Sequence, residues 1–237
     1  MPKYAAAIFD VFGTMVDWRS GVAAEVARMF AAKGAPVDAP AFADLWRGEY
    51  QPAMRKVREG ERGYVPLDVL HRKNLETVLA RMGHGGLFTD AEKAELNHAW
   101  EKLPAWPDVS DGLAQLKTGV FVAPCSNGSI ALMIRLARYA NLSWDAITGA
   151  EIGQGYKPDP KVYRQSAAAL GFAPEEVIMV ATHNDDLAFA RKAGLATGYF
   201  PRPDEFGLGV KMDLAPAQDW DVIAIDMGDM AEKLLKG

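Results

Sequence analysis

The stretch YAAAIFDVFGT, residues 4–14, predicts the first strand of a sheet and the turn that follows it. An apolar run from Tyr4 to Phe9 stops at Asp10, and a Gly13-Thr14 pair follows it. A short apolar run that ends at a polar residue and a glycine turn is typical of a buried strand. Asp10 is therefore predicted to stand just beyond the carboxyl end of a strand, where open α/β sheets bind their ligands.

Four later runs have the same character and predict the rest of a sheet. They lie at residues 119–125, 177–181, 196–200 and 222–225, and each is followed by a helical pattern. Strands that alternate with helices favour a parallel sheet covered on both faces. We therefore predict an α/β protein with a Rossmann-like core, in which residues 4–9 form one of the strands.

The segment between the first two strand-like runs contains only helical patterns. Ser20 is expected to cap its first helix, Asp38 and Pro40 to open a second, and Pro52 to kink or break it. Thr89 and Glu92 form a capping box for a later helix. We predict a helical cap domain, residues 17–103, inserted into a core domain of residues 1–16 and 104–237.

Composition excludes several classes of protein. The chain has 237 residues, 49% of them hydrophobic, and a net charge of −5 with no basic block, so we expect no nucleic-acid or membrane partner. Its N-terminal apolar run is too short for a signal peptide or a membrane span. Cys125 is the only cysteine, so no internal disulfide can form. We expect a cytoplasmic protein.

Polar residues follow the strand-like runs at their carboxyl ends. Ser126-Asn127-Gly128-Ser129 follows the run that ends at Cys125, and His183 to Asp186 follow the run at 177–181. Parallel strands bring such residues to one edge of the sheet, together with Asp10. This convergence is the strongest indication of a site that comes from the residues alone.

Each polar group has a functional and a plain structural interpretation. Asp10 is a nucleophile or a turn residue, and the serines cradle an anion or cap a helix. Lys157 points into the site to keep Asp10 ionised or lies on the surface. The Asp185/Asp186 pair binds Mg²⁺, or one aspartate pairs with Lys157 while His183 acts as a base, or the cluster caps a helix. The other histidines, His71, His84 and His98, are expected to be surface or packing residues.

At FDVFGT, residues 9–14, the chain resembles the haloacid dehalogenase superfamily. Candidates for all four superfamily motifs occur in order over essentially the whole chain: Asp10, Ser126, Lys157 and the Asp185/Asp186 pair. In the phosphatase members, a second aspartate stands two residues after the nucleophile as a general acid, but Phe12 stands there in this chain. A phenyl ring cannot protonate a phosphate ester, whereas a halide leaving group needs no proton. Phe12 therefore favours displacement at carbon.

Further segments are similar to the L-2-haloacid dehalogenases. Leu45-Trp46-Arg47 resembles their cap segment, whose arginine meets the substrate, and Lys157-Pro158-Asp159 with Tyr163 resembles their lysine and tyrosine segment. Ser126-Asn127 and Thr14 match further family positions. The chain departs from the family at His183, where an asparagine that positions the hydrolytic water is usual, and at Asp185, where an aromatic residue is common.

The resemblance implies a hydrolase that converts short (S)-2-haloalkanoic acids, haloacetates included, to 2-hydroxy acids and halide. Asp10 would form an ester intermediate, with Thr14 bonded to it, Lys157 keeping it ionised and Asp186 orienting Lys157. Ser126 would hold the substrate carboxylate, and Arg47 and Asn127 the departing halide. Phe12 and Trp46 would exclude water, Tyr163 would belong to the substrate site, and a neutral His183 would activate water. No cofactor or metal is expected, and the family suggests a homodimer.

Two other functions remain open from the sequence. A Mg²⁺-dependent phosphatase of the same superfamily would use the same motifs without the second aspartate. A non-catalytic binding protein on this fold would leave the polar set unused, although such clusters cost stability unless they serve a function.

Overall fold

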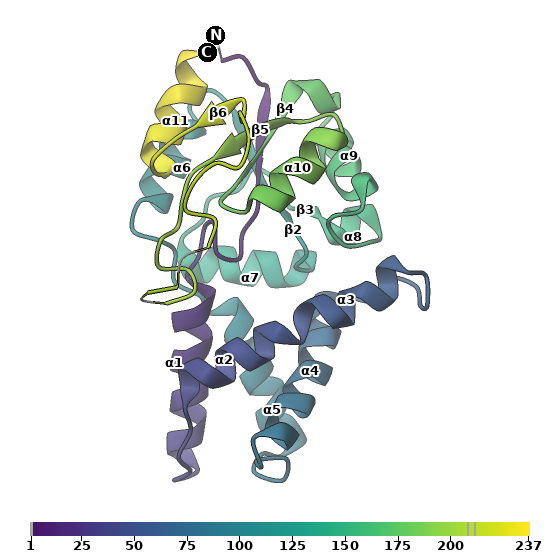
Figure 1. Ribbon diagram of the computed structural model, residues 1–237, viewed down its shortest axis with the longest axis vertical. Coiled ribbons are helices and arrows are strands. Elements are labelled where there is room, and N and C mark those ends of the chain that lie inside the picture. Colours follow the sequence, from purple (N-terminus) through teal and green to yellow (C-terminus); the bar gives the residue numbers. More distant parts are fainter. Residues whose placement is uncertain (1, 208, 211) are drawn as a thin grey trace.

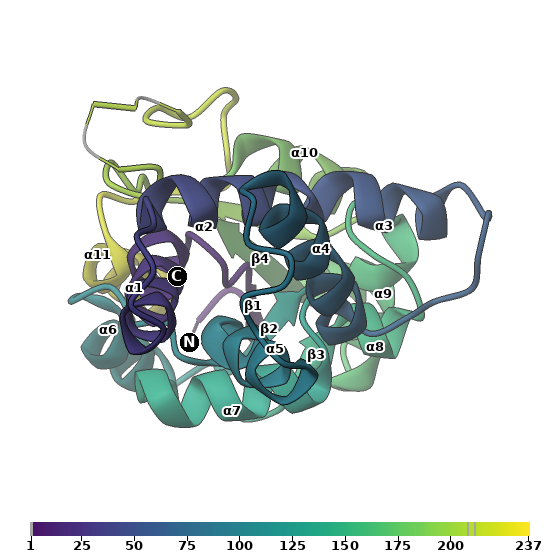
Figure 2. The same cartoon turned by 90° about the horizontal axis from the view of Figure 1, so that it is seen from below.

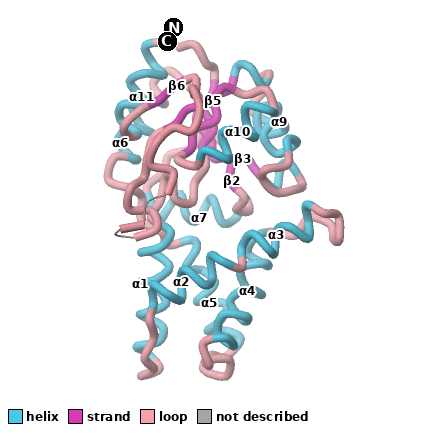
Figure 3. Tube along the Cα trace, in the orientation of Figure 1, coloured by secondary structure: helices cyan, strands magenta, loops and turns pink. Residues whose placement is uncertain are grey.

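The computed structural model describes residues 2–207, 209–210 and 212–237, and within them six parallel strands form one sheet in the order β3-β2-β1-β4-β5-β6. The strands are β1 (Ala6–Phe9), β2 (Phe121–Ser126), β3 (Thr148–Gly149), β4 (Val177–Ala181), β5 (Ala196–Tyr199) and β6 (Val222–Ile223). The predicted α/β core is confirmed, with the strands drawn in magenta in Figure 3, and β1 lies in the interior of the sheet between β2 and β4, as labelled in Figure 2. The two-residue β3 has no apolar run and was not predicted.

Burial on both faces explains why the strands read as continuous apolar runs. In β1, Ala7 and Phe9 belong to one hydrophobic cluster, while Ala6 and Ile8 belong to a second on the opposite face. Successive side chains of a strand point to opposite faces, so both faces must be covered. Figure 1 shows this cover, with α6 (Val109–Leu116) and α11 (Met227–Lys236) on one side and α9 (Pro160–Ala169) and α10 (Asn184–Lys192) on the other.

The remaining core helices lie near the lower edge of the sheet in Figure 1. They are α7 (Ile130–Ala140) and the short α8 (Ala150–Gly153). The 3₁₀ turn η2 (Pro174–Glu176) precedes β4 at the opposite, amino end of the strands, where the carbonyl of Glu176 accepts from the backbone N–H of Ala5. Ser129 caps α7 by accepting a hydrogen bond from the backbone N–H of Leu132, and Asp159 caps α9 in the same way. Both caps agree with the sequence and fix where the loops around Ser126 and Lys157 end.

All the elements between β1 and β2 are helices. They are α1 (Trp18–Ala32), α2 (Ala39–Gly48), α3 (Tyr50–Arg58), α4 (Leu67–Arg81), α5 (Asp90–Asn97) and the 3₁₀ turn η1 (His98–Glu101). They form a block beyond the edge of the sheet opposite the two termini (Figure 1), and Figure 2 shows that block from below with the strands behind it. We propose that this block is the cap domain of residues 17–103.

Two local predictions about the cap helices were wrong. Asp17, not Ser20, caps α1, because its carboxylate accepts from the backbone N–H of Ser20. The break after α2 falls at Glu49, and Pro52 lies in the first turn of α3. Proline is tolerated in a first turn, where its missing N–H has no helical partner in any case.

No helix in the described part of the chain has the length and apolarity that a membrane span requires.

Candidate active site

Asp10 lies where β1 ends, and its carboxylate is bonded on both oxygens. Its backbone N–H donates to the carbonyl of Val180, which continues the pairing of β1 with β4. The Thr14 hydroxyl donates to Oδ2 at 2.9 Å, and Lys157 Nζ lies 2.8 Å from Oδ1. Thr14 Oγ1 also accepts from the N–H of Thr182, which follows β4. The carboxylate is therefore fixed by groups from three loops.

Lys157 links Asp10 to a second carboxylate. Its ammonium lies 2.5 Å from Oδ2 of Asp186, in the first turn of α10, and the hydroxyl of Tyr163 in α9 donates to Oδ1 of Asp186 at 2.5 Å. The Lys157 side chain is only 7% exposed, so the ammonium has exchanged water for these two carboxylates. The geometry places Lys157 between Asp10 and Asp186, as the sequence led us to expect.

His183 lies between two carboxylates. Its Nδ1 is 3.1 Å from Oδ2 of Asp10, and its Nε2 is 3.0 Å from both oxygens of Glu205. Glu205 is 2% exposed and also accepts a bond from the indole N–H of Trp18 at 3.2 Å. An imidazole with a carboxylate at each nitrogen can satisfy both only by carrying a proton on each.

The pKa values follow from burial and these charges. Burial raises the pKa of Asp10, but Lys157 and His183 outweigh it and lower the pKa overall. Burial lowers the pKa of Lys157, but Asp10 and Asp186 outweigh burial and raise the pKa overall. Burial also lowers the pKa of His183, but Asp10 and Glu205 raise it to about 10. At neutral pH the structure therefore holds an aspartate, an ammonium and an imidazolium, and the neutral His183 expected from the sequence does not apply to this state.

Ser126 and Asn127 line the same edge of the sheet from the end of β2. The Ser126 side chain is fully buried, and its Oγ accepts from the backbone N–H of Gly128 at 3.0 Å. Asn127 Oδ1 accepts from the backbone N–H of Lys157 at 2.8 Å. This bond leaves the Asn127 amide nitrogen as a donor, and it joins the loop after β2 to the loop that carries Lys157.

Phe12 and Arg47 belong to an aromatic cluster formed by the cap. Phe12 is 3% exposed and meets the ring of Trp100 edge to face, with centroids 5.8 Å apart. The guanidinium of Arg47 lies over Tyr50 at 4.1 Å and over Trp18 at 5.5 Å, and Trp18 in turn bonds Glu205. Arg47 Nη1 is buried, with no hydrogen-bond partner in the part of the chain described. A cation–π setting of this kind leaves N–H groups available to an anion.

The structure separates the two neighbouring aspartates of the fourth motif. Asp186 takes part in the bonds to Lys157 and Tyr163, whereas Asp185 is exposed. His183 stands at the N-cap of α10 without a side-chain capping bond, so the helix-capping interpretation of this cluster is wrong for His183.

The cap histidines differ from one another. His71 is 1% exposed and stacks on Trp100 with centroids 4.3 Å apart. Burial, and then Arg47, lower the pKa of His71 well below its usual range. His98 contacts Glu101 at 2.9 Å, and the ring of His84 lies edge to face on Phe30. Packing or surface roles were expected for all three, and His71 is a packing residue.

Glu205 and Trp18 are the functional candidates that sequence reasoning missed. Glu205 lies in the irregular segment after β5, where no motif marks it. One signal was available, because residues just beyond β5 stand at the same carboxyl edge as Asp10 and Ser126.

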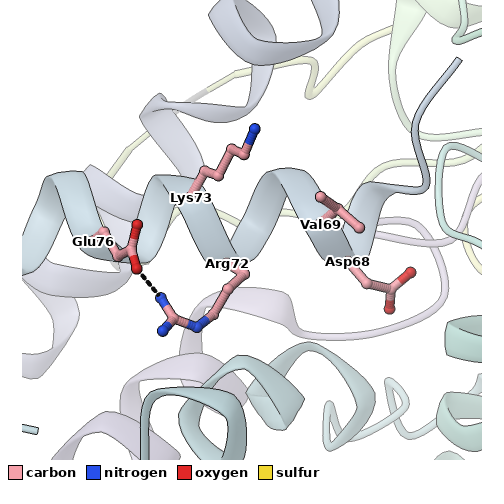
Figure 4. A pocket seen from close by; sticks show the side chains of 5 residues that line it. All are labelled: Asp68, Val69, Arg72, Lys73 and Glu76. Carbon is pink, nitrogen blue, oxygen red and sulfur yellow. Dashed lines mark hydrogen bonds and ion pairs between the residues drawn. The ribbon is translucent and has the colours of Figure 1, made fainter. Parts of the chain in front are cut away.

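An open hollow on α4 is separate from these residues. Asp68, Val69, Arg72, Lys73 and Glu76 line it. Figure 4 shows the ion pair of Arg72 and Glu76, at 2.6 Å. An exposed pair of this kind is worth little energetically and indicates no chemistry.

Comparisons with known proteins show the family of this chain. The family model of the haloacid dehalogenase-like hydrolases matches residues 4–194. The chain is 31% identical to (S)-2-haloacid dehalogenase 4A of Burkholderia cepacia over 197 residues, 81% of this chain and 80% of the relative. A solved structure of a defluorinating L-2-haloacid dehalogenase is 44% identical with a TM-score of 0.96, over 98% of this chain and 95% of that one. Another solved L-2-haloacid dehalogenase is 39% identical with a TM-score of 0.94, over 99% and 100%.

Proposed function

Because this chain belongs to the haloacid dehalogenase-like hydrolases, and among them to the L-2-haloacid dehalogenases, we propose that it hydrolyses the carbon–halogen bond of short (S)-2-haloalkanoic acids. The products are 2-hydroxy acids and halide. Relatives bear out the prediction of a hydrolase acting on carbon–halide bonds. The name of one relative supports testing the carbon–fluorine bond, and so haloacetates, alongside the chlorinated acids.

One observation carries the proposal: a buried, ionised Asp10 is held by Lys157, with Phe12 two residues away where an acid would be needed for a phosphate leaving group. A carboxylate freed from water is a nucleophile at carbon. The phenyl ring supplies no proton, and halide requires none.

The first step is a displacement at C2. One oxygen of Asp10 forms a bond to C2 from the side opposite the halogen, and the carbon–halogen electron pair leaves with the halide. C2 inverts and an ester to Asp10 results. Lys157 keeps Asp10 ionised before the step, while Asp186 and Tyr163 hold Lys157 in place.

Substrate binding is assigned to donors around Asp10. Ser126 and the backbone N–H groups after it bind the substrate carboxylate at the start of α7. Arg47 and the free amide hydrogens of Asn127 stabilise the departing halide, because preorganised donors act where negative charge develops. Phe12 and Trp46 keep water away from C2. Trp46 is fully buried, in support of that role.

The second step is hydrolysis of the ester. Water adds to the carbonyl carbon of Asp10, the bond to the alkyl oxygen breaks, and the 2-hydroxy acid leaves with Asp10 regenerated. His183 is the candidate base because its Nδ1 faces the Asp10 carboxylate. Thr14 donates a hydrogen bond to Oδ2 of Asp10, the same oxygen that His183 contacts.

The competing function is a Mg²⁺-dependent phosphatase. The exposure of Asp185 leaves Asp186 as the only member of the pair in the site, and Asp186 is bonded to Lys157. Together with Phe12, this arrangement favours the dehalogenase.

We also propose a cytoplasmic location and a homodimer. The location is supported by the cysteine count, because Cys125 is the only cysteine of the chain and no internal disulfide can form. The homodimer rests on the family resemblance. Light scattering coupled to gel filtration tests it, and a single species of 25.8 kDa would contradict it.

The deciding experiment is halide release from L-2-chloropropionate, chloroacetate and fluoroacetate, each with and without EDTA. We expect halide in both conditions. Absence of halide, combined with Mg²⁺-dependent phosphate release from a panel of phosphate esters, would instead establish the phosphatase. Absence of turnover in both assays would favour a binding protein.

A further inference from the structure

The contacts of His183 conflict with a simple role as a base. A base for water must have a nitrogen without a proton, yet His183 has carboxylates at both nitrogens, Asp10 on Nδ1 and Glu205 on Nε2. Its side chain is 21% exposed and that of Glu205 is 3% exposed. In the enzyme without substrate, the two anions hold His183 as an imidazolium.

We propose that Glu205 is the positioning residue for His183, and that esterification of Asp10 itself converts His183 from an imidazolium into the base for ester hydrolysis. The inference rests on the proposed function, because it requires an ester on Asp10. The ester has no charge, so forming it removes one of the two anions that hold the proton on His183. Glu205 remains and keeps the ring in place.

The protons balance over one cycle. After halide leaves, the imidazolium releases one proton to solvent and becomes neutral. The freed nitrogen then takes a proton from water as the water oxygen bonds to the Asp10 carbonyl carbon. When the alkyl oxygen leaves, it takes the remaining proton of that water, and Asp10 returns as a carboxylate beside a protonated His183. The net yield is one halide, one hydroxy acid and one proton.

The surroundings of Glu205 support a fixed position. Trp18 donates to Oε1, and the carboxylate lies directly against Gly13, where an added Cβ would come within 2.1 Å of Oε1. Gly13 has a φ of +94°. The loop that carries Asp10 therefore leaves room for Glu205 only because this residue is a glycine.

Other charged groups near the site have their own partners. They are Lys157, bonded to the other oxygen of Asp10; Asp186, bonded to Lys157; and Arg202, which pairs with Asp108 and donates to the carbonyl of Thr14. In the described ranges, Asp10 and Glu205 alone form ion pairs with His183.

The test is ¹⁵N NMR of the full-length protein labelled at its four histidines, titrated from pH 6 to 10. The His183 signals are those lost in the His183→Asn variant. Asp10→Asn mimics the uncharged ester, and Glu205→Gln removes the second anion. Asp213→Asn is the matched control, because Asp213 bonds Asn184 next in the chain rather than the ring of His183. The signals of the other three histidines report whether each variant is folded.

We expect an imidazolium in the wild type at pH 7.5, and a fall in the His183 pKa of at least about one unit in Asp10→Asn and in Glu205→Gln. Asp213→Asn should leave it unchanged. A neutral ring in the wild type, or an unchanged pKa in Asp10→Asn, would overturn the inference.

A kinetic arm separates this inference from the proposed function. In rapid quench experiments on Glu205→Gln, the first equivalent of chloride from L-2-chloropropionate should form at the wild-type rate, while ester hydrolysis slows at least about tenfold. If the wild type releases no halide, the proposed function fails whatever the NMR result. If halide forms and Glu205→Gln hydrolyses the ester normally, only the role of Glu205 and His183 fails.

Discussion

The ammonium of Lys157 lies 2.8 Å from Oδ1 of Asp10, although 147 positions separate the two residues in the chain. The same ammonium lies 2.5 Å from Oδ2 of Asp186, so one cation pairs with two carboxylates. Removing it would leave Asp186 without a cation and Asp10 with His183 alone, and breaking a buried pair costs far more than breaking an exposed one. The nucleophile therefore depends on a residue from a different loop for its charge.

Replacing Lys157 with methionine should abolish the first step. Without the ammonium, Asp10 loses the largest single effect that lowers its pKa, the charge of Lys157, so burial shifts Asp10 toward its protonated form, which is not a nucleophile. We expect halide release to fall by about a thousandfold or more, within the range that an activated nucleophile loses with its partner. Lys161→Met is the control, because Lys161 is largely exposed and pairs with Asp159. Comparable losses in both variants would contradict the assignment.

Tyr163 should act through Asp186 and have a smaller effect. Its hydroxyl donates to Asp186, and hydrogen bonds to charged groups contribute about 1.5–3 kcal/mol. Tyr163→Phe should therefore lower kcat/KM by about tenfold or more through a looser Lys157. Tyr199→Phe removes a buried hydroxyl bonded to the carbonyl of Asp213 and should leave kcat/KM intact. Unchanged kcat/KM in Tyr163→Phe would exclude this role.

How far the sequence predicts the site depends on where each residue lies. Asp10, Lys157, His183 and Asp186 were found because each follows an apolar run or stands in a recognisable motif, and the geometry of parallel strands brings their loops together. Glu205 has a weaker signal, because no motif marks it. It lies in the segment that follows β5, and only the folded backbone brings it to His183.

The strands and helices likewise divide into those that the sequence predicts and those that it does not. The interior strands β1 and β4 are buried on both faces and read as apolar runs, so they were predicted nearly to the residue. The edge strand β3 consists of Thr148 and Gly149, which form no apolar run, so nothing in the sequence marks it. The helical block was predicted from its apolar spacing, but the N-cap of its first helix was assigned to the wrong residue. Asp17 and Ser20 are both good capping residues, and in the structure the Asp17 carboxylate accepts the bond, from the backbone N–H of Ser20.

Stability should fall as the pH rises above neutrality, because of His183. Its pKa is about 10 in the folded protein against 6.5 for a free histidine. The raised value means that the contribution of His183 is fully present below pH 6.5 and is lost as the pH rises through about 10. Urea unfolding at pH 7 and pH 10 measures this contribution, and we expect the free energy of unfolding to fall by an amount on the order of a few kcal/mol. His183→Asn should lose less over the same interval, and an equal loss would contradict the pairing.

His71 should tolerate replacement by phenylalanine. Both ring nitrogens of His71 are buried, and the described chain offers neither a hydrogen-bond partner. An unsatisfied buried polar group costs about 1–3 kcal/mol, so His71→Phe should raise the free energy of unfolding by about that amount. Phenylalanine keeps the stacking on Trp100. Urea unfolding measures the change, and a destabilised variant would mean that a nitrogen of His71 has a partner in solution.

Gly13 should be essential for the second step because of its contact with Glu205. Gly13→Ala adds a methyl group 2.1 Å from Glu205 Oε1, which must move Glu205 away from His183. It also places a side chain at a φ of +94°, which alone costs about 1–2 kcal/mol. Gly34→Ala separates the two effects, because Gly34 has a φ of +62° with no atom within 4 Å of an added Cβ. Both variants should lose stability, but only Gly13→Ala should slow ester hydrolysis, measured as labelled ester persisting after quench. Equal hydrolysis rates in the two variants would mean that Glu205 does not need its observed position.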